Sequence, residues 1–285
     1  MPAPSVAIVT DSAAALPHSL QGKYQIGVVP LRLAIDGRTY SEGVNISAPR
    51  VVAELMGGKR ITVEEPPVEE LVNTYRALAD QGAHQVLSIH VSSKVHGVVE
   101  KAREAAKISP IPVQVIDTQT VAHQQGFIVL AAAATSFQGG NAAAAEFAAR
   151  NTQEHSTIVF TVDTMDYLHR DGRVPTPIKM ISNATKTRPV ITFADGDHKL
   201  LARVKGTAKA REYVRTYISD YVSEIVRPAV AVALVGGSAA DEGLNVVTDG
   251  PHYEESPGAS LAAHTGPGTY AVSAASMPAE FMIEA

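Results

Sequence analysis

Three short apolar runs in the first half of the chain end in acidic or hydroxyl residues. Runs of this length with such ends are typical of buried strands, and helical spacing of apolar residues follows two of them. Strands that alternate with helices predict a parallel sheet, whose ligands bind beyond the carboxyl ends of the strands. The runs are Val6–Thr10 before Asp11 and Ser12, Val86–Val91 before Ser92 and Ser93, and Val113–Ile116 before Asp117 and Thr118.

Helical patterns follow the second and third runs. The apolar residues within Val95–Ala106 fall at helical spacing, while the charged residues lie largely off that stripe, as on a surface helix. The pattern predicts a helix that begins at Ser92 and Ser93. An alanine-rich segment around Phe127–Ala134 predicts another helix.

The pattern changes beyond about residue 155. Strand-like segments there are joined by short turns, one of them an Asp-Gly turn typical of a hairpin, and one long helical segment separates them. This half is predicted to hold a mixed or antiparallel sheet with helices. The strand segments are Thr157–Val162, Pro189–Phe193, Leu200–Val204 and Ala229–Val235, and the helical segment is Ala208–Val226.

The predicted fold class is therefore α/β, with two domains. Residues 1–155 are expected to form an N-terminal domain with a parallel sheet flanked by helices. Residues 156–285 are expected to form a C-terminal domain with a mixed or antiparallel sheet and helices. The segment from Val28 to Tyr40 fits either sheet and is assigned to the first domain. A length of 285 residues agrees with about two ordinary domains.

Composition narrows the class of protein. With 45% hydrophobic and 19% charged residues, the chain has ample material for a core. Its net charge of −5 and the lack of long basic runs argue against a nucleic-acid partner. The absence of cysteine removes disulfides and thiol nucleophiles and suits the cytoplasm, where we expect the protein to act. We expect neither a signal peptide nor a membrane span.

Motifs with a known mechanism are scarce. The glycine-rich motifs for dinucleotides and phosphates and the G-x-S-x-G motif of hydrolases are missing. His84, His90 and His96 recur every six residues, which is not the i, i+4 spacing that places two imidazoles on one helix face. We therefore predict no metal site and no cofactor.

The serine pair allows several interpretations. At a helix start, Ser92 and Ser93 would cap the first turn, which stabilises it by about 1 kcal/mol, or help to bind a carboxylate or phosphate. In an enzyme, His96 would instead act as the base for a Ser93 nucleophile in acyl hydrolysis. Asp11 or Asp117 would then orient the imidazole.

Motifs spread in order over nearly the whole chain resemble those of the DegV family. No single motif is specific, but the ordered set with a His-Thr-Gly-Pro-Gly loop near the end marks the similarity. The motifs are Val9-Thr10-Asp11-Ser12, Val29-Pro30-Leu31, Ser92-Ser93-Lys94 before Gly97, Ile116-Asp117-Thr118, Asp163 with Tyr167-Leu168 and Gly172-Arg173, Arg188-Pro189-Val190, and His264-Thr265-Gly266-Pro267-Gly268.

The resemblance implies a lipid-binding protein rather than an enzyme. Members of the family are two-domain α/β proteins that hold a long-chain fatty acid in a tunnel. The fatty acid carboxylate lies near the domain interface, so the ligand is expected between the two domains. In bacteria with a fatty acid kinase, such proteins present the acid to a separate ATP-binding subunit, which makes an acyl phosphate and is the expected protein partner.

The resemblance also implies which residues bind the ligand. The serine pair matches the serines near the carboxylate, Arg173 matches the arginine of the Gly-Arg turn, and His264 matches the histidine of the glycine loop. Lys205, or Arg203, falls where the family usually has another arginine. The expected ligand-binding residues are Thr62, Ser92, Ser93, His96, Gly97, Arg173, Lys205 and His264.

One segment departs from the family pattern near the expected head group. The family has Thr-Ser-x-Pro-Ser there, whereas this chain reads ITVEEPP from residue 61. Thr62 is then the nearest hydroxyl, and Glu64 and Glu65 stand close to the ligand carboxylate. At about 4 Å and an effective dielectric constant of about 20, each like-charge pair costs roughly 4 kcal/mol before screening.

The next loop departs too, because His96 and Val98 replace two hydroxyl residues of the family. A charged imidazole at position 96 would attract an anion, or pair with Glu64 or Glu65 and neutralise it. An alternative function therefore stays open. The chain would be a divergent binder of an amphiphile whose head group is not a carboxylate, or an empty interaction module.

Overall fold

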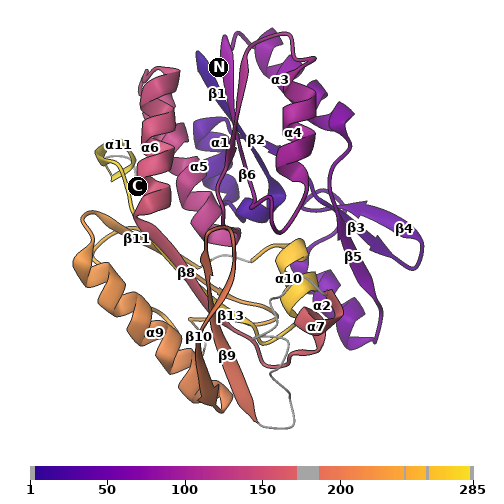
Figure 1. The fold of residues 1–285 in the computed structure, drawn as a ribbon, viewed down its shortest axis with the longest axis vertical. Coiled ribbons are helices and arrows are strands. Elements are labelled where there is room, and N and C mark those ends of the chain that lie inside the picture. The colour runs from indigo at the N-terminus through magenta and orange to yellow at the C-terminus, as the bar shows by residue number, and fades with distance from the viewer. Residues whose placement is uncertain (1–3, 172–185, 241, 255–256, 283–285) are drawn as a thin grey trace.

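Three sheets form the framework of the described part of the chain. The computed structural model describes residues 4–171, 186–240, 242–254 and 257–282. Within these ranges it contains a four-stranded parallel sheet, a six-stranded mixed sheet and a three-stranded antiparallel sheet. In Figure 1 the parallel sheet lies in the upper part, the mixed sheet in the lower part, and the small sheet at the right. The predicted α/β class is confirmed.

The parallel sheet has the strand order β2-β1-β6-β7. Side chains of β1 alternate between its two faces. Ile8 belongs to the buried cluster that includes α5, and Val9 to the cluster that includes α3 and α4. Burial on both faces explains the continuous apolar run of β1. The strands are β1 (Val6–Asp11), β2 (Gly27–Val29), β6 (Gln85–His90) and β7 (Val113–Asp117).

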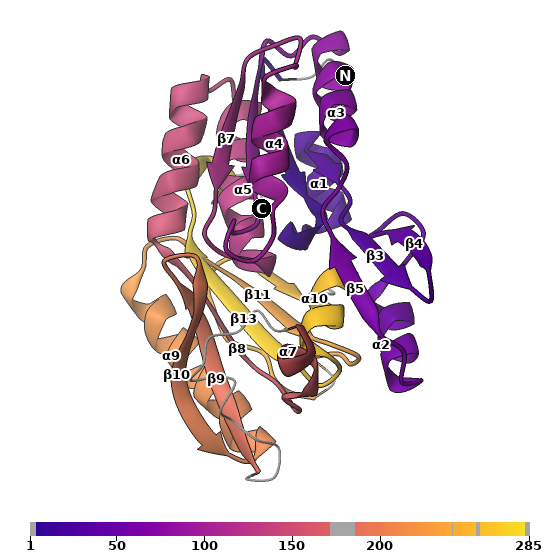
Figure 2. The same cartoon turned by 45° about the vertical axis from the view of Figure 1, so that its right-hand side comes forward.

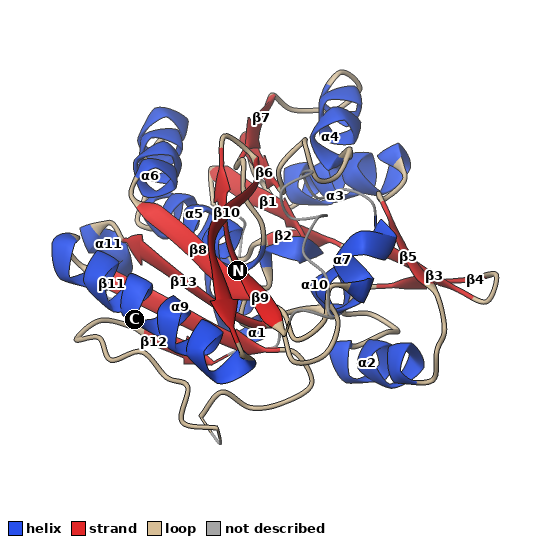
Figure 3. Cartoon of the chain, turned by 60° about the horizontal axis from the view of Figure 1, so that its bottom comes forward, coloured by secondary structure: helices blue, strands red, loops and turns tan. Residues whose placement is uncertain are grey.

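Helices cover both faces of the parallel sheet, as Figure 3 shows. Helix α5 is buried around its whole circumference, since every residue from Ala122 to Ser136 is buried. One buried cluster joins Leu87, Phe127 and Ala231, which come from β6, α5 and β11, so α5 lies between the parallel and the mixed sheet. The helices are α1 (His18–Tyr24), α3 (Val68–Asp80), α4 (Val98–Ala106), α5 (Ala122–Phe137) and α6 (Ala142–Glu154), with a 3-10 turn at Ser12–Ala14.

The predicted helix start at Ser92 and Ser93 is wrong. Residues 93–95 form a turn, and α4 begins at Val98 after Gly97. The backbone N–H groups of Val95 and His96 both donate to the carbonyl oxygen of Ser92, at 2.9 and 3.0 Å. The serine pair is therefore followed by a turn, and the helix begins only after that turn.

The segment from Val28 to Tyr40 divides between two sheets. Strand β2 joins the parallel sheet, while β3 pairs with β4 on one side and with β5 on the other in the antiparallel sheet. Asp36 and Gly37 both have positive φ, at 49° and 76°, which suits a two-residue hairpin turn. The elements of this region are β3 (Arg32–Ile35), β4 (Arg38–Ser41), α2 (Ala48–Met56) and β5 (Ile61–Glu64).

The mixed sheet has the order β10-β9-β8-β13-β11-β12, and only β11 and β12 pair in parallel. Helix α9 packs on one face through Ala210, Val214 and Ile218, which recur every four residues, as Figure 2 shows. The elements are β8 (Ser156–Thr161), α7 (Asp166–Asp171), β9 (Thr187–Ala194), β10 (Asp197–Lys205), α9 (Thr207–Glu224), β11 (Pro228–Leu234), β12 (His252–Glu254), α10 (Ala259–Thr265), β13 (Tyr270–Ser276) and α11 (Ala279–Met282).

The strands of the two large sheets come from separate parts of the sequence. Those of the parallel sheet end at Asp117, and those of the mixed sheet begin at Ser156. The division into domains at residue 155 stays a prediction. None of the helices in the described ranges is long and apolar enough to cross a membrane.

Candidate functional site

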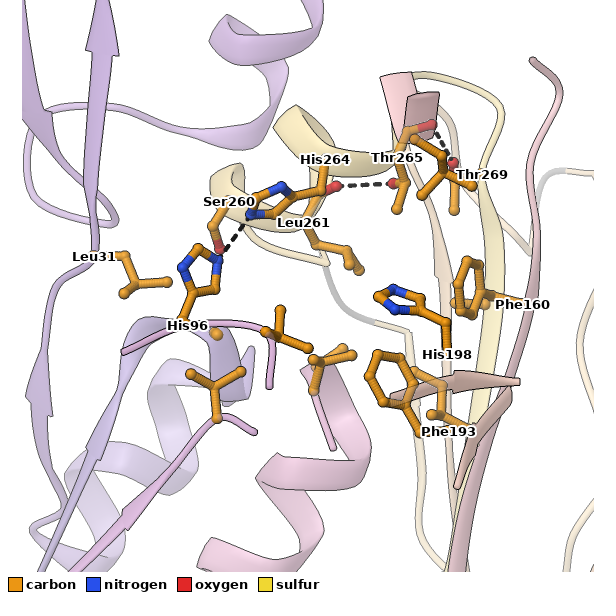
Figure 4. Close-up of a pocket in the computed structure, with 18 residues that line it drawn as sticks. Leu31, His96, Phe160, Phe193, His198, Ser260, Leu261, His264, Thr265 and Thr269 are labelled. Carbon is orange, nitrogen blue, oxygen red and sulfur yellow. Dashed lines mark hydrogen bonds between the residues drawn. The ribbon is translucent and has the colours of Figure 1, made fainter. Parts of the chain in front are cut away.

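An apolar pocket lies where the loop after β6, helix α10 and the mixed sheet meet (Figure 4). The space between its atoms, including the part open to solvent, is about 690 Å³. Binding pockets for small molecules commonly have apolar walls with few polar groups, as this pocket has. Both halves of the sequence contribute to this wall, including Leu31, Val91, Val121, Ile158, Phe193 and Leu261.

The hydroxyl groups in this wall donate to other protein atoms. Ser260 Oγ donates to the Glu42 carboxylate at 3.1 Å. Thr265 and Thr269 donate to backbone carbonyl oxygens of α10 and the loop after it, both at 2.8 Å. Each hydroxyl has one proton to donate, and it is already used. The titratable side chains of the wall are three imidazoles. They are His96, His198 and His264.

His96 and His264 form a pair at one side of the pocket. Their Nε2 atoms are 2.9 Å apart and their ring centroids 5.0 Å apart. At this distance one Nε2 carries a proton and donates a hydrogen bond, and the other Nε2 accepts that hydrogen bond. The pair therefore holds a single N–H between the rings.

Glu65 approaches His96 from its other nitrogen. Its Oε1 lies 3.7 Å from His96 Nδ1 and accepts a hydrogen bond from the backbone N–H of Gly97 at 2.9 Å. The His96 imidazole, together with this N–H, lowers the pKa of Glu65 to about 2 although partial burial acts to raise it. Of the alternatives that the sequence left open for His96, the structure has the approach to Glu65, while Glu64 is exposed on β5.

A second, more polar pocket of about 610 Å³ shares His264 with the apolar one. Thr62, Arg60 and Arg170 line it, and all three are exposed. The structure thus brings the predicted residue Thr62 to the solvent side of His264. A head group at His264 would lie next to this polar pocket.

Ser92 and Ser93 do not line the apolar pocket. Ser92 is fully buried, and its hydroxyl donates to the Gly196 carbonyl oxygen at 2.6 Å. Ser93 donates to Asp117 Oδ2 at 2.6 Å. The nucleophile and base of the hydrolase alternative are therefore not paired, because Ser93 donates to Asp117 and His96 is bound to His264.

The other predicted contacts lie elsewhere. Lys205 is exposed at the end of β10 and is not among the residues that line the apolar pocket. Arg173 lies outside the described residues. The ligand-binding roles assigned to these two residues stay predictions.

Two glycines hold the loop after α10 in place. A Cβ on Gly266 would lie 2.0 Å from the Tyr167 ring, and one on Gly268 would lie 2.1 Å from Asp163 Oδ2. Both glycines also have positive φ, which other residues rarely adopt. This contact between distant motifs fixes the C-terminal end of the helix that carries His264.

Glu42, which the sequence did not mark, holds the other end of α10. It is buried, and its carboxylate accepts hydrogen bonds from the Ser260 N–H at 2.7 Å and from the Ser12 hydroxyl at 2.6 Å. An acid at a helix N-terminus is stabilised by the unpaired N–H groups there. Glu42 therefore positions α10 against the first half of the chain.

A buried hydrogen-bonded chain resembles a hydrolase triad. His90 Nδ1 lies 2.9 Å from Asp11 Oδ2, and His90 Nε2 lies 2.7 Å from Ser88 Oγ, which also contacts Tyr75. Burial raises the pKa of Asp11, but the hydrogen bonds from His90 and Val91 outweigh it and keep that pKa below its usual value. All three triad-like residues are fully buried, and their hydrogen bonds join the neighbouring strands β1 and β6. The described residues contain no cluster of side chains suited to a metal ion.

Comparisons with known proteins extend over nearly the whole chain. A family model described as "Uncharacterised protein, DegV family" matches residues 5–277. A DegV domain-containing protein from Streptomyces coelicolor is 35% identical over 205 residues, which are 72% of this chain and 73% of the relative. One from Deinococcus radiodurans is 30% identical over 274 residues, covering 94% and 97% of the two chains.

Solved structures share the architecture. One described as "Fatty Acid Binding of a DegV family Protein from Thermus thermophilus" has a TM-score of 0.87 and 28% identity, and the match covers 97% of this chain and all of that one. The structure of DegV from Bacillus subtilis, described as a fatty acid binding protein, has a TM-score of 0.83 at 22% identity, with 96% and 99% covered. The second likeness shows the fold alone.

Proposed function

Because the chain belongs to the DegV family, we propose that it binds one long-chain fatty acid in the apolar pocket. The alkyl chain lies against the apolar wall, and the carboxylate lies at the His96–His264 pair, near the junction of residues 1–155 with residues 156–285. The observation that carries this proposal is an apolar pocket with an imidazole pair at one side. The fatty acid binding of the Thermus thermophilus relative supports it.

The energetics agree with such a ligand. Burial of each CH₂ group contributes about 0.8 kcal/mol, so a long alkyl chain supplies most of the affinity. An imidazole N–H of His264 that points away from His96 would donate to the carboxylate, and charge-assisted hydrogen bonds of this kind are the stronger ones. The chain binds the head group through hydrogen bonds without a nucleophile, in keeping with a binding protein.

The proposal includes presentation of the fatty acid to a kinase subunit in the cytoplasm. His264 borders both the apolar pocket and the polar pocket with Thr62. A carboxylate bound at His264 would be reached from that polar pocket by an ATP-binding partner. The partner transfers the phosphoryl group, and this chain holds and orients the acid.

A pocket-filling variant tests the proposal. Leu261 lines the apolar pocket on α10, and Leu261→Trp would occupy the space of the alkyl chain. After removal of bound lipid, calorimetric titration with stearic acid should give one site per chain, and the variant should bind at least tenfold more weakly. Val247→Trp is the matched control because Val247 is 90% exposed. Equal affinity in both variants would reject the pocket as the binding site.

A second candidate is a lipid whose head group carries no negative charge. The observation that favours it is Glu65, which already occupies the Gly97 N–H and lies beside His96. An alcohol or ester head avoids the repulsion that a carboxylate meets there. Titration with stearic acid and with stearyl alcohol separates the candidates, since the fatty acid proposal requires tighter binding of the acid.

A further inference from the structure

The polar pocket beside His264 carries positive charge. Its wall contains Arg60, Arg170 and Thr62, and among the described residues that line it there is no aspartate or glutamate. Helix α10, which carries His264, contacts α2, β5 and α7 (Figure 2). Arg60 directly precedes β5, and Arg170 belongs to α7. Two arginines from distant parts of the sequence therefore line the same pocket.

Neither of these guanidinium groups is neutralised by a carboxylate. Other arginines of the described ranges form ion pairs, as Arg32 does with Glu70, but neither Arg60 nor Arg170 does so there. Cζ of Arg170 lies 5.5 Å from the centre of the Tyr167 ring. Such packing uses the face of the guanidinium, so the N–H groups in its plane remain able to bind an anion.

A phosphate suits this pocket better than a carboxylate does. A carboxylate has two oxygen atoms and one negative charge, whereas a phosphate monoester has three terminal oxygen atoms and a charge of about −1.5 to −2 at pH 7. Guanidinium groups match the geometry of phosphate oxygens and bind them by charge-assisted hydrogen bonds. The negative charge of Glu65 lies at His96, outside this pocket. A more highly charged head group is therefore favoured on the side of Arg60 and Arg170.

We propose that the polar pocket binds the phosphate of a single-chain lipid through Arg60 and Arg170. His264 lines both pockets, so an alkyl chain in the apolar pocket brings its head group to the polar one. Lipids with a phosphate head group are then a second class of ligand besides fatty acids. An acyl phosphate and a lysophosphatidic acid share this chemistry. The inference rests on the proposed function, because it places the alkyl chain in the same apolar pocket.

A change of head group on one alkyl chain tests the inference. The delipidated protein is titrated with stearic acid and with octadecyl phosphate, which has a chain of the same length. The native chain should bind the phosphate about tenfold tighter than the acid, because the charge-assisted hydrogen bonds are additional. In Arg60→Gln and in Arg170→Gln this ratio should fall about three- to tenfold, the size expected for one lost hydrogen bond.

Each variant is measured with both ligands, so effects on folding or on the apolar pocket cancel in the ratio. Arg38→Gln is the matched control, because Arg38 is exposed on β4 and lines neither pocket, and it should keep the native ratio. Lysophosphatidic acid, which has a glycerol between chain and phosphate, separates the two sources. Tighter binding of octadecyl phosphate supports an acyl phosphate, and tighter binding of lysophosphatidic acid supports a lipid released from a membrane.

Two results would overturn the phosphate site alone. In one, neither phosphate lipid binds more tightly than stearic acid. In the other, the preference for phosphate persists unchanged in both arginine variants. Failure of every ligand to bind would overturn the proposed function as well.

Discussion

His96 and His264 face each other with their Nε2 atoms 2.9 Å apart, although 168 positions separate them in the sequence. One residue follows the parallel strand β6 and the other lies in the last turn of helix α10. Their contact joins the two halves of the chain at the proposed head-group position. Five predictions follow from the contacts around this site and from the packing that supports it.

Loss of an imidazole should weaken head-group binding. His264→Ala should lower stearic acid affinity about tenfold or more, because a hydrogen bond to a charged group contributes roughly 1.5–3 kcal/mol. Calorimetric titration at pH 7 measures this change, and urea unfolding checks that the fold persists. His252→Ala removes an exposed histidine as the control. Unchanged affinity in His264→Ala would place the carboxylate elsewhere.

Removal of the Glu65 charge should strengthen fatty acid binding. Glu65→Gln keeps the shape of the side chain beside Gly97 and removes the repulsion, so stearic acid affinity should rise about tenfold, or about 1.4 kcal/mol. Glu64→Gln is the control, since Glu64 is exposed on the same strand. A lower affinity in Glu65→Gln would show that this carboxylate helps to orient His96 for the ligand.

The pH range of the Glu65 effect follows from its low pKa, about 2. Its folded pKa lies below the ordinary value of 4.5, so its stabilising effect on the fold is complete above about pH 4.5 and disappears as the pH falls toward 2. Glu65 stays charged between pH 5 and pH 8. A change of the affinity ratio of Glu65→Gln to the native chain within that range would therefore come from an imidazole and not from Glu65.

His123 should make the fold less stable in mild acid. It is buried on α5, and burial lowers its pKa from 6.5 to about 4. The unfolded chain therefore binds a proton that the folded chain does not, and stability falls as the pH drops from about 6.5 to about 4. The loss between pH 7 and pH 5 should be about 2 kcal/mol.

Urea unfolding at these two pH values measures the effect. The His123→Leu variant has an apolar side chain of similar size at this position. Its free energy of unfolding should fall between pH 7 and pH 5 by about 2 kcal/mol less than that of the native chain. An equal loss in both proteins would mean that His123 is protonated in the folded state.

The close contact of Gly268 with Asp163 should make that glycine irreplaceable. Gly58 and Gly268 have φ of 81° and 80°, but a Cβ on Gly58 meets no atom within 4 Å. Gly58→Ala should cost about 1–2 kcal/mol from backbone strain, and Gly268→Ala a further 1–3 kcal/mol from crowding. The free energies of unfolding in urea measure both. Equal costs would show that Asp163 moves aside freely.

Strands were the most predictable part of the fold. The run of β1 is apolar throughout because both of its faces are buried, and the Asp-Gly turn before β10 combines two residues with positive φ. These are local signals. The helix start at Ser92 failed because Ser92 bonds to Gly196 and Ser93 to Asp117, and such distant partners leave no trace in the spacing of apolar residues.

The candidate site was predictable only where one residue type stood out locally. His264, in a glycine-proline loop, and His96, where the family has a hydroxyl residue, were recognised and do line the pocket. Glu42 was missed because an acid in a turn is usually a surface residue. His198 was missed as a pocket residue because its place depends on how the β9–β10 hairpin packs against the rest of the pocket.

The lipid that the protein carries tests the central claim most directly. Native mass spectrometry of the purified chain, followed by solvent extraction and identification of the released compound, measures both stoichiometry and head group. The account predicts one long-chain fatty acid per chain, lost in Leu261→Trp and kept in Val247→Trp. A chain that carries no lipid and binds no added fatty acid, or one that carries a lipid without a carboxylate, would contradict it.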